Sequence, residues 1–137
     1  MRNLLEIYEE ADANDVMILE HKIGDRKSII AHAQDTTAIA VNSKLIETTA
    51  EEKTIIMHEM GHHYTGAYYT EHSKFELKCR KEYRAHRCSV MRYLPLEELQ
   101  EAVNKGYTEI YELAEYFDVT EDFILTAIDI YKRQGKL

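Results

Sequence analysis

The sequence predicts an α+β fold that is mostly helical, with a small β-sheet near the N-terminus and a helical unit at the C-terminus. Two observations lead to this class. Apolar residues recur at helical spacing over most of the chain, whereas the short β-prone runs are confined to its first 41 residues. The length of 137 residues, with 45% hydrophobic and 31% charged side chains, suits one globular domain. We therefore expect a single domain over residues 1–137.

The N-terminal third is expected to form one helix followed by three strands. Residues 4–13 carry apolar side chains at helical spacing, and residues 16–19 form a short apolar run that suits a strand better. Residues 28–31 and 37–41 are two further β-prone runs, separated by the polar residues 34–36. These runs predict a small three-stranded sheet.

A second helix is expected to begin at Thr49. Thr49 and Glu52 have the spacing of a capping box, in which each side chain accepts a hydrogen bond from the other residue's backbone N–H. Gly61 lies inside this helix, where glycine lowers helix stability, so we expect a neighbouring element to pack too closely there for a side chain. Gly66 is expected to end the helix.

A third helix is expected after a loop over residues 66–73. Residues 74–94 contain neither Gly nor Pro, and Pro95 stops the helical pattern. Residues 1–95 should therefore contain the sheet and these long helices, and residues 96–137 the C-terminal helical unit.

The C-terminal unit resembles a helix-turn-helix. Residues 107–117 are expected to form a helix, residues 118–120 a turn, and residues from 121 onward another helix capped by Thr120. The last helix begins with two acidic residues, which does not suit a helix end that must meet DNA phosphates. We therefore interpret the motif as a packing unit. Its apolar positions are Leu113, Ala114, Phe117, Val119, Phe123, Ile124 and Ile128.

Charge, composition and cysteine content exclude several classes of function. The net charge of −8 disfavours a nucleic-acid-binding surface, which needs clustered Lys and Arg. The N-terminal segment has no uninterrupted apolar stretch for a signal peptide or a membrane span, so we expect a cytoplasmic protein with no membrane partner. Cys79 and Cys88 are nine residues apart in an expected helix, and we expect both to be reduced packing residues.

The segment from His58 to His62 has the pattern H-E-x-x-H. On a helix, His58 and His62 lie four residues apart on one face, so their imidazoles can bind the same metal ion. Glu59 is then placed beside the metal to accept a proton. Zinc held by two such histidines, a third protein ligand and a water is the arrangement of a metalloprotease, with the glutamate as general base.

The third ligand is expected from the helix over residues 74–94. The candidates are Glu76, Glu82 and His86. The small Ala85 follows Glu82 by about one turn and would allow the two long helices to approach closely. From spacing alone, Glu82 fits equally well as a solvated charge on a Lys- and Arg-rich helix.

Four motifs agree in order and spacing with the ImmA/IrrE family of zinc metallo-endopeptidases, which this chain resembles from about residue 36 to residue 130. The motifs are Ala38-Ile39-Ala40-Val41-Asn42, His58-Glu59-Met60-Gly61-His62-His63, Glu82-Tyr83-Arg84-Ala85-His86 and Leu94-Pro95. The resemblance implies a zincin-like metalloprotease core that binds Zn²⁺. It also implies that His58, His62 and Glu82 are the metal ligands and that Glu59 is the catalytic base.

The chain departs from the family pattern at His86, where the family usually has Asn. His86 lies four residues after Glu82 and could bind the metal, orient Glu82, or fill the Asn position. We favour a role in the second shell of the metal. Another difference lies at Cys88-Ser89-Val90, where family members commonly have an aromatic residue and small residues.

The resemblance implies a protein substrate, namely a helix-turn-helix repressor of a phage or mobile element. The alternative is a non-proteolytic, zinc-containing binding regulator that sequesters a transcription factor. Hydrolysis also requires a group that stabilises the oxyanion. The sequence offers candidates near the motifs without choosing among them: Tyr64, Tyr68, Tyr69, His72 and Tyr83.

Overall fold

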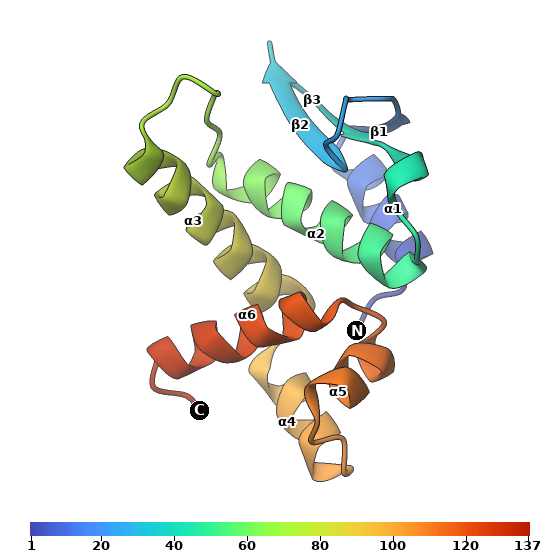
Figure 1. Ribbon diagram of the computed structural model, residues 1–137, viewed down its shortest axis with the longest axis vertical. Helices are drawn as coiled ribbons and strands as arrows, with labels where there is room; N and C mark the ends of the chain where they lie inside the picture. Colours follow the sequence, from blue (N-terminus) through green and yellow to red (C-terminus); the bar gives the residue numbers. More distant parts are fainter.

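The computed structural model describes residues 1–137 and has the expected α+β fold. The sheet and α1 lie at one end of the molecule, α2 and α3 cross beside one another in the middle, and the last three helices lie at the other end (Figure 1). The elements are α1 (Leu4–Ala13), β1 (Val16–Glu20), β2 (Ser28–Ala33), β3 (Thr36–Val41), a 3-10 turn (Ser43–Leu45), α2 (Thr49–Thr65), α3 (Phe75–Tyr93), α4 (Leu96–Asn104), α5 (Ile110–Phe117) and α6 (Glu121–Arg133).

The three predicted strands form one mixed sheet in the order β1-β3-β2. β3 is central, pairing in parallel with β1 and antiparallel with β2. Gln34 and Asp35 join β2 to β3 and both have positive φ, 50° and 65°, as a tight two-residue hairpin requires. β2 is therefore an edge strand with one side of its backbone unpaired.

The helix that carries H-E-x-x-H begins and ends nearly as predicted. Its N-cap is Thr48, whose hydroxyl accepts a hydrogen bond from the Glu51 N–H, so the prediction of a cap at Thr49 was wrong by one residue. Two consecutive threonines each precede a glutamate by three positions, and pattern alone does not distinguish them. Gly66 ends the helix in the left-handed conformation, with φ of 65°, which confirms the predicted stop.

Gly61 and Ala85 are the point of closest approach between α2 and α3. A Cβ atom at Gly61 would lie 2.3 Å from the carbonyl oxygen of Ala85, which is too short for a non-bonded contact between carbon and oxygen. Ala85 itself is fully buried. The prediction of close packing at Gly61 is confirmed, and this contact sets how far α3 lies from the motif on α2.

The C-terminal unit consists of three helices. α5 begins at Ile110, three residues later than predicted, and Thr120 caps α6 by accepting a hydrogen bond from the Phe123 N–H. The predicted apolar positions are buried, except for the half-buried Ile128. They belong to one cluster of 22 buried residues that also includes residues of α1, α2 and the sheet.

Two buried polar contacts join this unit to the rest of the molecule. Lys53 of α2 donates to the carbonyl oxygen of Phe117 at 2.7 Å, at the end of α5. Tyr131 of α6 donates to the carbonyl oxygen of Leu94 at 2.8 Å, at the end of α3. Burial lowers the pKa of Lys53, although the charges of Asp118 and Glu6 act in the opposite direction.

The two cysteines are free and do not have equivalent environments. Cys88 is half-buried, but Cys79 is exposed on α3, so its expected packing role was wrong. No helix of the chain combines the length and apolar character that crossing a membrane requires.

Candidate metal centre

Helices α2 and α3 bring three predicted ligands into one cluster. The Nε2 atoms of His58 and His62, one turn apart on α2, lie 3.2 Å from each other. The Glu82 carboxylate enters from α3, with Oε2 at 2.9 Å from His58 Nε2 and Oε1 at 3.0 Å from His62 Nε2. The approach of the helices at Gly61 and Ala85 makes this reach possible.

The geometry of the three atoms fits a tetrahedral zinc ion. With bonds of about 2.0–2.1 Å, neighbouring ligand atoms of such an ion lie roughly 3.3 Å apart, close to the three distances in the cluster. His62 Nδ1 lies 2.6 Å from the carbonyl oxygen of Ala67 and can donate to it. That bond leaves the Nε2 lone pair of a neutral His62 facing the cluster, as a metal ligand requires.

The electrostatics of the cluster also favour a bound cation. Burial acts to raise the pKa of Glu82, but hydrogen bonds from His58, His62 and Tyr69 outweigh it and hold that pKa well below its ordinary value. Burial acts to lower the pKa of His62, but its bonds to Glu82 and Ala67 raise it overall. Glu82 therefore stays ionised, and positive charge is stabilised at the point where the three side chains meet.

Glu59 lies beside this cluster and is almost entirely buried, with 5% of its surface exposed. One of its carboxylate oxygens and one nitrogen of each motif histidine all lie within 4.8 Å of one another. Burial raises the pKa of Glu59, with His58 and His62 acting in the opposite direction. A carboxylate with raised basicity next to the candidate metal position is suited to accept a proton from water.

His86 lies next to the cluster without forming a hydrogen bond to Glu82. Its Nε2 is 3.9 Å from Glu82 Oε2, and its ring centroid is 4.3 Å from that of His58. Burial and the neighbouring His58 lower the pKa of His86 to about 4, so the ring is neutral at physiological pH. Its role in the second shell stays a prediction. Glu76, the other candidate ligand on α3, is exposed in the first turn of the helix.

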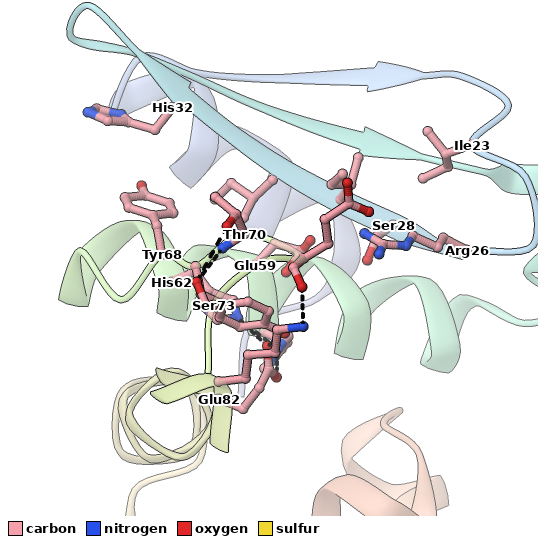
Figure 2. Close-up of a pocket in the computed structure, with 16 residues that line it drawn as sticks. Ile23, Arg26, Ser28, His32, Glu59, His62, Tyr68, Thr70, Ser73 and Glu82 are labelled. Carbon is pink, nitrogen blue, oxygen red and sulfur yellow. Dashed lines mark hydrogen bonds and ion pairs between the residues drawn. The ribbon is translucent and has the colours of Figure 1, made fainter. Parts of the chain in front are cut away.

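A cleft of about 1120 Å³ opens over the cluster (Figure 2). Its walls are edge strand β2, the loop of residues 66–74, and the facing sides of α2 and α3. In Figure 2, β2 crosses one side of the cleft, Glu59 points into it, and Glu82 enters from the opposite side. A metal ion bound to the cluster would therefore be reached directly from this cleft.

The structure shows which of the five candidates for stabilising the oxyanion lie in the cleft. The Tyr64 hydroxyl donates to Glu10, the His72 side chain is 88% exposed, and the Tyr83 ring lies beneath Arg133 of α6. Only Tyr68 and Tyr69 line the cleft. The Tyr69 hydroxyl donates to Glu82 Oε1 at 2.6 Å, and burial together with this bond raises the Tyr69 pKa to about 12.

Two parts of the site were not predicted from the sequence. The Ala67 carbonyl, which binds His62, could have been anticipated because the chain turns back just after the helix ends at Gly66. The contribution of β2, including Ser28 and His32, depends on strand pairing between distant residues, and no local pattern identifies it.

Comparison with known proteins agrees with this geometry. The family model Peptidase M78, described as the IrrE N-terminal-like domain, matches residues 11–129 and thus most of the chain. The match includes every residue of the metal cluster. No curated protein and no solved structure matches the chain.

Proposed function

Because the chain belongs to the family of IrrE N-terminal-like peptidases, we propose that it is a zinc-dependent endopeptidase that cleaves a regulatory protein. The observation that carries this proposal is the convergence of His58, His62 and Glu82 within 3.2 Å of one another, beside the buried Glu59 and at the floor of an open cleft. The proposed ligands are these three side chains, and the proposed base is Glu59.

The proposed reaction is hydrolysis of a peptide bond. When bound, zinc lowers the pKa of its water ligand and polarises the substrate carbonyl. Glu59 accepts a proton from the attacking water as the water oxygen bonds to the carbonyl carbon. Glu59 then delivers this proton to the amide nitrogen as the C–N bond breaks, so one water is consumed and a carboxylate and an amine are formed.

The shape of the cleft supports a polypeptide substrate. β2 lies along the cleft with Ser28, Ile29, Ile30 and His32 among the lining residues, and it is an edge strand. An extended peptide can pair its backbone with such an edge, which gives affinity without requiring one particular sequence. A cleft that is open along a strand accepts the interior of a chain, as an endopeptidase requires.

The expected substrate is a helix-turn-helix repressor of a phage or mobile element. The charge distribution is compatible with it, since residues 96–137 contain ten acidic and only four basic side chains. A repressor has a basic DNA-binding surface, and opposite charges accelerate the encounter of two proteins. Accordingly, the acidic C-terminal unit is the part of this protein that we expect to attract it.

The proposal is tested by incubating the zinc-loaded protein with a purified helix-turn-helix repressor of a phage or mobile element. We expect two discrete fragments, identified by mass spectrometry, that do not form after zinc has been removed with a chelator. Stable binding of the repressor without any fragment would instead establish the alternative function, a non-proteolytic regulator that sequesters its target.

A further inference from the structure

We propose that Tyr69 is the catalytic residue that donates a hydrogen bond to the developing oxyanion during peptide hydrolysis. This inference rests on the proposed function. It assigns a role to a residue that lies outside the H-E-x-x-H segment and outside the segment around Glu82. The position of the Tyr69 hydroxyl, the hydrogen bonds that hold its loop, and the different environment of the neighbouring Tyr68 support this role.

The Tyr69 hydroxyl lies at the edge of the metal cluster. It donates to Glu82 Oε1 at 2.6 Å, and the same oxygen lies 3.0 Å from His62 Nε2. The Tyr69 ring lies edge-on to the His62 ring, with the centroids 6.2 Å apart. The O–H group therefore contacts one of the proposed metal ligands directly, on the side of the cluster that lines the cleft.

Tyr69 and Glu59 approach the cluster at different ligands. Glu59 is grouped with His58 and His62, whereas the Tyr69 hydroxyl contacts Glu82. A carbonyl group placed in the cleft can thus meet the base and the donor at separate atoms. Water activated by Glu59 attacks the carbon, while Tyr69 faces the oxygen, which carries the developing negative charge.

The loop that carries Tyr69 is held on both sides of this residue. Before it, Ala67 is fully buried and its carbonyl accepts the hydrogen bond from His62. After it, the Thr70 N–H donates to the Ser73 hydroxyl at 3.0 Å, and the Ser73 N–H donates to the Thr70 carbonyl at 3.1 Å. These bonds fix the backbone before substrate arrives, which is the preorganisation that oxyanion stabilisation requires.

The Tyr69 hydroxyl needs only a small movement to donate to the oxyanion. A phenol has one O–H, which in the resting protein points to Glu82. Rotation about the bond between the ring and its oxygen redirects this hydrogen to a carbonyl oxygen in the cleft without movement of the loop. Glu82 loses a donor that it needs less once a cation lies beside it, so the exchange favours the transition state.

Tyr83 provides a matched control outside the cleft. It follows Glu82 on α3, but its ring lies beneath Arg133 of α6 and does not line the cleft. Tyr83→Phe removes the same hydroxyl without removing a hydrogen bond to the cluster. Tyr68 does line the cleft, but its ring stacks on His32 with centroids 5.3 Å apart, against β2 and apart from Glu82 (Figure 2).

The experiment compares wild type, Tyr69→Phe and Tyr83→Phe at saturating zinc, with occupancy verified by metal analysis. The substrate is one fluorescence-quenched peptide, selected from a mixture because wild type cleaves it. We expect Tyr69→Phe to lower kcat by about 100-fold with little change in KM, and Tyr83→Phe to stay within about threefold of wild type. Equal kcat for Tyr69→Phe and wild type would overturn the proposal.

A second readout does not depend on turnover. A phosphinic peptide carries tetrahedral, anionic oxygens in place of the scissile amide and thus imitates the transition state. Calorimetry should show at least about tenfold weaker binding to zinc-loaded Tyr69→Phe than to zinc-loaded Tyr83→Phe. Equal binding would overturn the role of Tyr69. Failure of wild type to cleave any peptide would count against the proposed function, and the phosphinic peptide would still decide the role of Tyr69.

Discussion

At the scale of single residues, we expect the side chain of Glu82 to determine whether the cluster binds a metal. It bridges His58 and His62 at 2.9 and 3.0 Å, and no other carboxylate of α3 is placed to do so. We expect Glu82→Gln to weaken zinc binding by roughly 100-fold, because an amide is a poor zinc ligand. The control is Glu76→Gln, exposed on the same helix, and competition with a fluorescent chelator measures both. Equal affinity in the two variants would remove Glu82 from the ligand set.

The pH dependence of zinc binding follows from His62. Bonds to Glu82 and Ala67 raise its pKa above the ordinary value, and zinc binds only the unprotonated ring. Affinity should therefore be complete above the raised pKa and fall as the pH decreases through it. We expect binding at least about tenfold weaker at pH 6 than at pH 8. Titration of the metal-free protein with zinc at pH 6 and at pH 8 measures this difference. Equal zinc affinity at the two pH values would contradict the prediction.

At the scale of elements, the contact between Gly61 and Ala85 positions α3. Alanine normally stabilises a helix relative to glycine by about 1 kcal/mol. In Gly61→Ala, however, the new methyl group would meet the Ala85 carbonyl oxygen at 2.3 Å and would push the helices apart. We expect a loss of roughly 2 kcal/mol in the free energy of unfolding, together with weaker zinc binding as Glu82 withdraws. Urea denaturation and zinc titration measure the two effects, and a stabilised variant with unchanged zinc affinity would show that the helices do not constrain each other.

A second contact between elements joins α2 to the C-terminal unit. Lys53 is buried and donates to the carbonyl oxygen of Phe117 at 2.7 Å. Lys53→Ala should lower the free energy of unfolding by roughly 2–3 kcal/mol, because it leaves a buried carbonyl unpaired and a cavity. Lys132→Ala, on the exposed side of α6, is the control and should change stability by less than about 0.5 kcal/mol. A similarly small effect of both substitutions would mean that the Lys53 hydrogen bond does not stabilise the packing of the C-terminal unit against α2.

At the scale of the whole molecule, the metal is expected to stabilise a fold that does not depend on it. The 22-residue apolar cluster extends from Ile7 to Tyr131 and lies outside the ligand set. Removal of zinc with a chelator should therefore leave the helical circular dichroism at 25 °C intact. At zinc concentrations 100 times Kd, binding adds about 2.7 kcal/mol, which corresponds to a rise in Tm of roughly 10 °C. Loss of helical signal on chelation would show that the fold depends on the zinc.

Sequence patterns predicted most of the fold because most of it is local. The helices follow from apolar spacing and from stops at Gly66 and Pro95, and the strands from short β-prone runs. Ligand spacing on α2 and the family motif around Glu82 indicated the members of the cluster. The cap at Thr48 was missed because its neighbour Thr49 fits the same local rule. The strand order and the selection of Tyr69 depend on contacts between distant segments, which periodicity does not encode.

Cleavage of the repressor by Glu59→Gln and by wild type, both zinc-loaded, shows whether Glu59 is the base of a hydrolytic site. Glu59 is buried beside the cluster but is not one of its three proposed ligands. We therefore predict full zinc occupancy in the variant and a loss of cleavage rate of at least about 1000-fold, because the amide cannot accept the proton of the water. Glu71→Gln, a substitution on the exposed rim of the same cleft, should cleave at the wild-type rate. Cleavage by Glu59→Gln at that same rate would contradict the account.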